Sequence, residues 1–592
     1  MRQGRLALVT LALLLAIPAA AFASLGWQPT QLMVPAPGTG DEGPDGQLSI
    51  ATAADGTATA AWVRSFNTNT GRHYAVDVSV RPPDGDWGPV EQIGSSRSDG
   101  GVALAVAPDG AAAAVWGDEQ DGTIHLAMRP AGGSFGPPQA LTPGGSGARQ
   151  AAQVAIDSAG DVVVGWRNRL PSPGMEDQID ATVVSPSGAA SPVQVLDDLV
   201  AGGGPYSGEA LELSSVVPDG SGNVYLEWRH SFTDIQHPAN SYDRIEIATL
   251  GSGQSSFGAP TSIATAMGGV TLQEPGLAGN AAGDLLITWK RAPASGKATV
   301  EGRYRHGGEP LSGKLFEVPQ PDGLDADRPV PAIAPDGSGG FVWGAGPHAA
   351  YADTIWAAKV SSTGALGTPV ALGGGVTPEL AAGPSGELIA SWGGPPINLY
   401  FNRVYASVSP PGHGFSDATP LSDVLASPSS PRVAIQPSGD AVAIWIGPPD
   451  YSHARYQWSA EYEAGEPHAG GSALDPVTPA AATPVPSRAD PVRSGGEVTS
   501  FSVSRHRFAT AGRHRGTSFR YSLAEPGRVR IVISRSRDHR RLGTIERDAS
   551  VRAGVIRFSG RLRSRPLPAG LYRATISAGA GAGPSVSFRV LG

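Results

Sequence analysis

The sequence predicts an all-β protein, built as a ring of about eight repeated sheets with a smaller β-domain at the C-terminus. Eight tryptophans each follow a glycine by six residues, and they recur at intervals of 49 to 62 residues within the 592-residue chain. After residue 500, alternating apolar runs continue without this spacing. A repeat of about 50 residues is typical of stacked supersecondary units and not of one irregular core.

The Gly–Trp pairs define the repeating unit. They are Gly56/Trp62, Gly110/Trp116, Gly160/Trp166, Gly222/Trp228, Gly283/Trp289, Gly337/Trp343, Gly386/Trp392 and Gly439/Trp445. In the second unit, residues 102–107, 111–116, 123–129 and 135–141 read as four short strands between polar turns. Four such strands match one blade of a β-propeller. The glycine supplies positive φ in the first turn and the tryptophan packs between blades, so we interpret both as structural.

The two ends of the repeat region predict how the ring closes. The eighth unit, around Trp445, runs into a Pro-rich stretch and lacks a fourth strand. A matching segment, 27–34, precedes the first complete unit. We expect this N-terminal outer strand to complete the last blade, which would remove exposed sheet edges. The prediction is therefore an eight-bladed propeller, with a seven-bladed ring and one irregular unit as the alternative.

The remaining segments predict the domain organisation. Residues 1–23 read as a secretory signal peptide, with a charged start, an apolar stretch and a small-x-small cleavage site. Residues 24–465 hold the propeller, 466–499 form a Pro/Ala/Gly-rich linker, and 500–592 hold strands that fit a small β-sandwich. No later segment is long and apolar enough to span a membrane. We expect a secreted, extracellular monomer, with association at the cell surface as a further possibility.

Composition and charge narrow the partners. The chain has no cysteine, which excludes disulfides and thiol chemistry. Its net charge is −9, yet residues 501–592 carry 19 arginines and only 4 acidic residues. An acidic body with a basic tail predicts contact between the tail and an anionic cell-wall polymer; an arginine-rich solvated surface is the alternative. Secretion and missing stacking motifs argue against nucleic acid. The candidate contacts are Arg513, Arg515, Arg535, Arg537, Arg540 and Arg541.

Familiar catalytic motifs do not fit their required settings. The GxSxG match at 132–136 lies in a hairpin turn, whereas a nucleophile elbow joins a strand to a helix. There is no HExxH motif and no EF-hand loop. His230, Asp234 and His237 lie close enough in sequence to be considered as metal ligands, but solvated loop histidines are the commoner outcome. We therefore predict no metal and no cofactor.

The loops that follow the tryptophans are longer and more varied than the turns at the opposite end of each unit. Variable loops on a rigid scaffold commonly carry binding residues. The largest group lies in 167–178, 197–212 and 229–244. Aromatic and polar side chains on such a rim suit carbohydrate or peptide ligands. The candidate ligand-binding residues are Tyr206, His230, Phe232, Asp234, His237 and Tyr242.

Two resemblances add to this interpretation. The repeats resemble those of secreted bacterial multi-blade β-propeller proteins of unassigned activity. The stretch LPAGLYRATISA at 567–578 resembles the closing hairpin of bacterial immunoglobulin-like domains, which implies an immunoglobulin-like accessory sandwich. Sialidase-like propellers place a glycine three residues before a tryptophan, and the spacing here is six, so no catalytic residue is carried over.

These observations favour a secreted, non-enzymatic binding or interaction scaffold for carbohydrate or peptide ligands at the bacterial surface. The same observations weigh against an enzyme. The alternative is a secreted hydrolase or lyase that acts on polysaccharide. That alternative requires two carboxylates facing each other about 5–10 Å apart, with Asp177, Asp234 and Asp243 as first candidates.

Overall fold

The structure, a computed structural model, describes residues 27, 31–33, 43–462 and 498–591. Within these ranges residues 69–70, 84, 97–100, 119–121, 143–147, 171–175, 200–206, 320–323, 347–352, 396–400, 423–424, 427–430, 448–455, 504–506, 510–516, 524–526, 536–539, 550–552, 563–564 and 579–584 are not described. The predicted signal peptide and nearly all of the predicted linker lie outside the described residues. The chain divides into two compact units, Trp27–Ala464 and a second that contains Gly465–Gly592.

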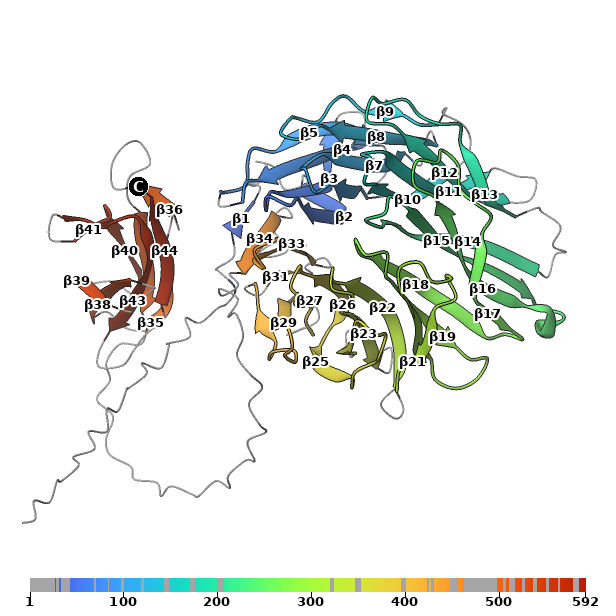
Figure 1. The fold of residues 1–592 in the computed structure, drawn as a ribbon. Coiled ribbons are helices and arrows are strands. Elements are labelled where there is room, and N and C mark those ends of the chain that lie inside the picture. The colour runs from blue at the N-terminus through green and yellow to red at the C-terminus, as the bar shows by residue number, and fades with distance from the viewer. Residues whose placement is uncertain are drawn as a thin grey trace, which may run out of the picture. The chain divides into compact units, whose positions relative to one another are not determined.

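The first unit contains eight four-stranded antiparallel sheets among its described residues, which we number in chain order (Figure 1). Sheet 1 contains β2 (Gly43–Thr52), β3 (Ala58–Thr68), β4 (Gly71–Arg81) and β5 (Glu91–Ser96). Sheet 2 contains β6 (Ala103–Val106), β7 (Ala112–Asp118), β8 (Thr123–Arg129) and β9 (Gln139–Ala140). Sheet 3 contains β10 (Ala148–Ile156), β11 (Val162–Leu170), β12 (Glu176–Val184) and β13 (Gln194–Asp198). Sheet 4 contains β14 (Ser207–Pro218), β15 (Val224–Asp234), β16 (Tyr242–Leu250) and β17 (Thr261–Met267).

The second half of the ring repeats the pattern. Sheet 5 contains β18 (Thr271–Gly279), β19 (Leu285–Ala292), β20 (Thr299–Arg305) and β21 (Lys314–Glu317). Sheet 6 contains β22 (Asp325–Ile333), β23 (Gly339–Gly346), β24 (Thr354–Val360) and β25 (Val370–Gly374). Sheet 7 contains β26 (Val376–Ala382), β27 (Leu388–Gly393), β29 (Val404–Ser409) and β30 (Thr419–Pro420). Sheet 8 contains β32 (Arg432–Ile435), β33 (Ala441–Gly447), β34 (Tyr456–Tyr462) and β1 (Gln31–Leu32). A one-turn 3₁₀ helix, η1 (Pro238–Asn240), and a small pair, β28 (Phe401–Asn402) with β31 (Leu425–Ala426), lie in connections.

The first strand of each sheet lies beside the first strand of the next, and this series closes on itself. β2 lies beside β6, β6 beside β10, and so on through β14, β18, β22, β26 and β32, which returns to β2. Eight units, not seven, therefore contribute a sheet to the ring. We call these eight strands the inner strands and the ends of the sheets that carry the connections after the tryptophans the loop ends.

The predicted N-terminal strand closes the ring. β1 pairs antiparallel with β34, with Gln31 opposite Ser459, and Trp27 forms a further bridge to Tyr462. Sheet 8 is thus assembled from both ends of the unit. Arg81 of sheet 1 and Glu461 of sheet 8 form an ion pair at 2.9 Å across the junction, and both side chains are almost fully buried. This arrangement confirms the predicted closure.

The Gly–Trp pairs are structural, as predicted. All eight turn glycines have φ between 81° and 90°, a region that L side chains rarely adopt. All eight tryptophans are at most 1% exposed and lie in apolar clusters that join adjacent sheets. Trp116 shows how close this packing is, because a Cβ on Gly94 of sheet 1 would lie 2.3 Å from its ring.

The C-terminal unit forms two sheets around one core. The first contains β35 (Val498–Val503), β37 (Thr517–Leu523) and β40 (Ala553–Phe558). The second contains β36 (Arg507–Ala509), β44 (Ser585–Leu591), β43 (Gly570–Ala578), β38 (Gly527–Arg535) and β39 (Arg541–Ala549), and a short pair, β41 (Arg561–Leu562) with β42 (Arg565–Pro566), accompanies them. Four stacked or edge-on phenylalanines, Phe508, Phe519, Phe558 and Phe588, occupy the centre of the core. A two-sheet arrangement fits the predicted β-sandwich. Among the described residues of the whole chain, no helix is long and apolar enough to cross a membrane.

Candidate functional site

Three inner strands share an unusual backbone conformation near their loop ends. Glu274, Arg328 and Thr377 have φ of 52°, 45° and 49°, and they are the only described residues other than glycine with positive φ. Each precedes a proline, which normally favours an extended conformation. Each also lies at a bulge, where the register of β18, β22 or β26 shifts against its partner strand. Strained backbone of this kind gathers at functional sites.

The bulges bring charged side chains of sheets 5 and 6 together. The backbone N–H of Arg328 donates to Oε2 of Glu274 at 2.7 Å. The Nζ of Lys290 on β19 binds Oδ1 of Asp327 at 3.0 Å. Glu274 and Asp327 interact directly as a pair of carboxyl groups. Glu274 and Arg328 are exposed although they lie on inner strands, so water reaches both side chains.

Sheets 7 and 8 add a third carboxylate and its cation. Glu379 on β26 forms an ion pair with the guanidinium of Arg432 on β32. Both side chains are partly buried. Glu274, Asp327, Arg328 and Glu379 thus come from three successive inner strands. We call Glu274, Lys290, Asp327, Arg328, Glu379 and Arg432 the inner-strand charge cluster.

The electrostatics of the cluster raise the pKa of two of its carboxyl groups. Desolvation of the Glu274 carboxyl by the protein around it raises its pKa, and the negative charge of Asp327 raises it further, while the Arg328 N–H and Lys290 act in the opposite direction. Burial likewise raises the pKa of Glu379, and Arg432 and Arg328 oppose that effect. Because Oε2 of Glu274 accepts the Arg328 N–H, the proton of the neutral acid belongs on Oε1.

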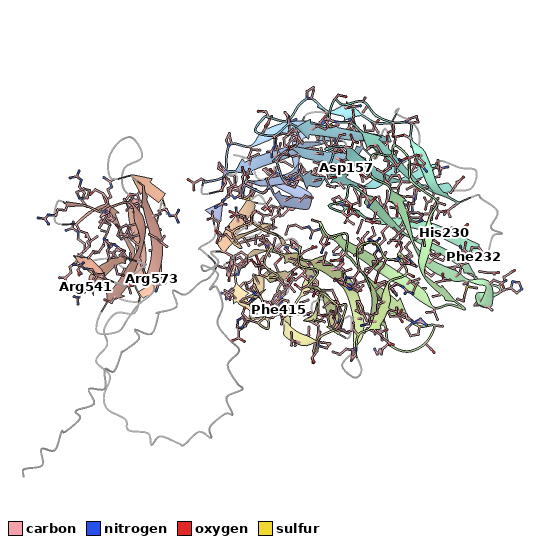
Figure 2. All side chains as sticks on the ribbon, viewed as in Figure 1. Asp157, His230, Phe232, Phe415, Arg541 and Arg573 are labelled. Carbon is pink, nitrogen blue, oxygen red and sulfur yellow. The ribbon has the colours of Figure 1, made fainter. Side chains whose placement is uncertain are left out.

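The predicted ligand-binding residues form a different group, on sheet 4. His230 bridges two carboxylates, with Nδ1 at 2.9 Å from Asp197 and Nε2 at 2.8 Å from Glu209. The Tyr242 hydroxyl lies 3.1 Å from Glu209, and Phe232 stacks on the Tyr242 ring. Figure 2 labels His230 and Phe232 on this part of the ring. Three of the six predicted residues therefore meet at the loop end of sheet 4.

The other predicted residues of this loop are not part of that contact. Asp234 accepts the backbone N–H groups of Gln236 and His237 in the turn before η1, and the His237 side chain is 69% exposed. Tyr206 lies outside the described residues. Over the part of the chain that is described, no group of three or more His, Asp or Glu side chains is arranged to hold a metal ion. Ligand binding by these residues stays a prediction.

The electrostatics of His230 identify a link between sheets 3 and 4. Burial alone would lower the pKa of His230, but its hydrogen bonds to Asp197 and Glu209 outweigh burial and raise it. For Asp197, burial acts upward, and the hydrogen bonds from His230 and Trp228 bring the net pKa below its usual value. Since Asp197 lies on β13 and His230 on β15, the pair joins two neighbouring sheets.

The first-choice catalytic aspartates have structural partners. Asp177 forms ion pairs with Arg167 at 2.5 Å and Arg169 at 3.3 Å. Asp243 is 1% exposed and forms an ion pair with Arg229 at 2.7 Å. Asp234 lies in the turn before η1, so none of the three aspartates belongs to the inner-strand charge cluster.

Of the predicted surface arginines in the C-terminal unit, three are described. Arg535 and Arg541 lie near the ends of β38 and β39 that the 536–540 connection joins, and the N–H of Arg535 donates to the carbonyl of Arg540 at 3.0 Å. Arg541 also donates to the Thr544 hydroxyl at 2.6 Å. Arg513, Arg515 and Arg537 lie outside the described residues. Contact with an anionic polymer stays a prediction.

The sequence did carry a signal for the inner-strand charge cluster. Pro275, Pro329 and Pro378 each lie eight residues before the turn glycine of their unit, in three successive units. A proline at the same place in successive inner strands marks an interruption of regular pairing. The ligand-binding residues predicted from the sequence all lie in expected loops, so these residues within strands were not among them.

No protein-family model and no curated protein matches the sequence. Among solved structures, an α-L-arabinanase from Penicillium chrysogenum complexed with arabinobiose is 13% identical, with a TM-score of 0.31, over 52% of this chain and 92% of that one. The β-propeller domain of the Trilobed protease from Pyrococcus furiosus is 9% identical, with a TM-score of 0.34, over 64% and 96%. A leech intramolecular trans-sialidase is 8% identical, with a TM-score of 0.33, over 74% and 94%.

The comparisons contradict one expectation from the sequence. Arabinanase, arabinofuranosidase and trans-sialidase structures are among the similar chains, and they contradict the expected non-enzymatic scaffold. The alternative, an enzyme acting on polysaccharide, agrees with these structures better. Identities of 8–14% and TM-scores near 0.3 transfer no activity to this chain.

Proposed function

We propose that this chain is a hydrolase that cleaves glycosidic bonds of a polysaccharide at the inner-strand charge cluster. The observation that carries the proposal is the Glu274–Asp327 carboxyl pair, which a strained bulge holds at a water-accessible position on an inner strand. Glycoside hydrolysis generally requires one carboxyl group that is protonated near neutral pH and a second that is ionised. The cluster supplies candidates for both.

Glu274 is the proposed proton donor. Its raised pKa favours the protonated form, which can donate to the leaving-group oxygen, and the Arg328 N–H leaves Oε1 as the atom that carries this proton. Asp327, paired with Lys290, is the proposed modulator, because its negative charge raises the pKa of Glu274. This division of labour between neighbouring carboxyl groups follows from their different environments.

Glu379 is the proposed second carboxylate. Burial raises the pKa of Glu379, and its ion pair with Arg432 opposes that effect in favour of the ionised form, which can direct a water molecule or stabilise positive charge on the sugar ring. Arg328 is exposed on β22, the inner strand between those that carry Glu274 and Glu379. It is in place to contact hydroxyl or carboxylate groups of a bound sugar.

Turnover of a panel of neutral and acidic polysaccharides, followed by reducing-end release, tests the proposal. We expect Glu274→Gln to lower kcat by about 10²–10⁴-fold on any polysaccharide that the wild type cleaves. Glu317→Gln is the matched control, since Glu317 is an exposed carboxylate on β21 of the same sheet. Full activity of Glu274→Gln, or no cleavage of any polysaccharide by the wild type, would overturn the proposal.

We also propose that the enzyme acts outside the cell and that its arginine-rich C-terminal unit attaches it to an anionic wall polymer. Support comes from the signal-like residues 1–23 and from the 19 arginines of residues 501–592. Binding of the full chain to teichoic-acid-type polymer, measured by sedimentation at low and high salt, tests the second part. Arg535→Gln/Arg541→Gln should weaken binding, and equal binding by this variant at low salt would contradict it.

A further inference from the structure

Glu227 on β15 is a buried carboxyl group that the proposed chemistry does not use. Its exposure is 0%, and neither carboxyl oxygen has a hydrogen-bond partner within normal distance among the described residues. Its strand neighbour Tyr225, two residues earlier, packs with Ile245, Ile247 and sheet 5 residues in the apolar layer between sheets 4 and 5. In a strand, residues two apart share a face, so Glu227 faces the same layer.

No other repeat places a charge at this position. The residue before the tryptophan is Ala61, Val115, Gly165, Thr288, Val342, Ser391 or Ile444 in the other seven units. A carboxyl group buried among apolar side chains is costly unless it is neutral and hydrogen-bonded. Since only one of the eight equivalent positions carries an acid, contacts specific to sheet 4 must account for it.

The neighbourhood of Glu227 accounts for this acid. Ser214 lies in the bulge of β14, and its hydroxyl donates to the carbonyl oxygen of Pro275, the residue after Glu274. Ser215 pairs with Glu227 in the register of β14 and β15, so the bulge places Ser214 next to the position opposite Glu227, and the Ser214 hydroxyl opposes the upward shift of the Glu227 pKa. Glu227, Ser214 and Pro275 thus follow one another from the buried layer to the bulge that carries Glu274.

The next unit contains a simpler version of the same contact. Thr288, at the position equivalent to Glu227, donates its hydroxyl to the carbonyl oxygen of Pro329 at 3.4 Å. Pro329 follows Arg328, as Pro275 follows Glu274. A hydroxyl from the preceding sheet therefore binds each of these two bulges. Only at the Glu274 bulge does a buried carboxyl group, that of Glu227, lie next to that hydroxyl.

We propose that Glu227 is a positioning residue that, in its protonated form, donates a hydrogen bond to Ser214 and so holds the Glu274–Pro275 bulge in place. The proposal rests on the proposed function of Glu274. A serine hydroxyl has one proton to donate. Neutral Glu227 donates its own proton to the Ser214 oxygen, so the Ser214 hydroxyl still donates to the carbonyl oxygen of Pro275. Ionised Glu227 can only accept, so it competes with that carbonyl oxygen for the Ser214 proton.

The surroundings determine when this competition begins. Burial raises the pKa of Glu227 to about 8, and the Ser214 hydroxyl opposes burial only in part. The nearest cation on its own strand, Arg229, is already paired with Asp243 of β16 and Glu212 of β14. The facing strand β18 contributes Glu274, another acid. Glu227 is therefore neutral at neutral pH, and the bulge loosens as pH rises past 8.

Hydrogen exchange of the full chain without substrate tests the positioning step. We expect exchange of residues 271–279 in the wild type to rise about fivefold to tenfold over Glu227→Gln at about pH 9, and to match it at about pH 6. Gln keeps the donor and does not ionise, whereas Glu227→Leu should exchange fast at both pH values. Residues 325–333, anchored by Thr288, are the internal control and should not respond.

Activity provides the second arm. If the wild type cleaves a polysaccharide, its alkaline limb near pH 8 should be absent in Glu227→Gln, with kcat and not KM affected. Equal exchange of wild type and Glu227→Gln at both pH values, or full protection in Glu227→Leu, would overturn the positioning role. The expected exchange pattern without any turnover would instead overturn only the hydrolase proposal.

Discussion

Replacing Glu227 by glutamine should stabilise the first unit at neutral pH. An ordinary glutamate has a pKa near 4.5, and burial raises the pKa of folded Glu227 to about 8. The folded state therefore holds a proton that the unfolded state has released. The contribution of this carboxyl group to stability is complete below about pH 4.5 and is lost as pH rises to about 8.

The size of the effect follows from the pH interval. At pH 7 the interval above 4.5 is about 2.5 units, which corresponds to about 3 kcal/mol, and above pH 8 the loss levels off at about 5 kcal/mol. Glutamine does not ionise and keeps a similar shape and donor. Glu227→Gln should therefore match the wild type near pH 4.5 and exceed it increasingly up to pH 8.

Thermal unfolding of the full chain across this pH range is the assay. For a unit of this size we expect Tm of Glu227→Gln to exceed the wild type by about 3 °C at pH 7 and about 5 °C at pH 9. The exposed Glu317→Gln variant is the control and should show no pH-dependent difference. A constant difference between Glu227→Gln and wild type at all pH values would refute the buried, neutral carboxyl.

Four further predictions concern other parts of the ring. Arg81→Met leaves Glu461 buried without its partner and should cost about 3–5 kcal/mol in urea unfolding, most of which Arg81→Met/Glu461→Gln should restore. Because the pKa of His230 is raised, its stabilising contacts are complete below about pH 6.5 and decline at higher pH, so the Tm difference between wild type and His230→Phe should shrink as pH rises. Thr377→Gly relieves a β-branched residue at φ 49° and should raise the free energy of urea unfolding by about 1 kcal/mol, and an unchanged or lower value would contradict strain at this position. A chain beginning at residue 43 lacks β1, leaves β34 as an open edge and should self-associate in light scattering, whereas a monodisperse product would contradict the role of β1.

Much of the ring could be predicted because its repeat places the same residue types under the same constraint eight times. A glycine with positive φ and a tryptophan buried between sheets leave few substitutes, so their six-residue spacing survives in every unit. In the second unit the predicted strand 123–129 matches β8, whereas the predicted strand 135–141 contracts to β9 (Gln139–Ala140). Pro137 and Pro138 lack the N–H groups that a longer outer strand would need.

The candidate site was harder to predict because it depends on breaks in that pattern. A bulge adds one residue to a strand, so the alternation that assigns side chains to faces no longer holds beyond it. Glu274 before Pro275 also suggests extended backbone, and the structure places it at positive φ instead. The His230 contacts were partly predictable, since the loop group named His230, Phe232 and Tyr242, but their partners Asp197 and Glu209 come from other strands.

The join between β1 and β34 has a consequence for how the protein is made. Sheet 8 combines residues 31–32 with residues 432–462, so a chain emerging from the ribosome holds an unpaired first strand until more than 400 further residues have followed. Seven sheets can form in order during that time, but the ring closes only when β32, β33 and β34 have been synthesised. Synthesis that stops early therefore yields an open array of sheets with unpaired edge strands. Loss of β1 likewise leaves β34, at the other end of the unit, without its partner strand.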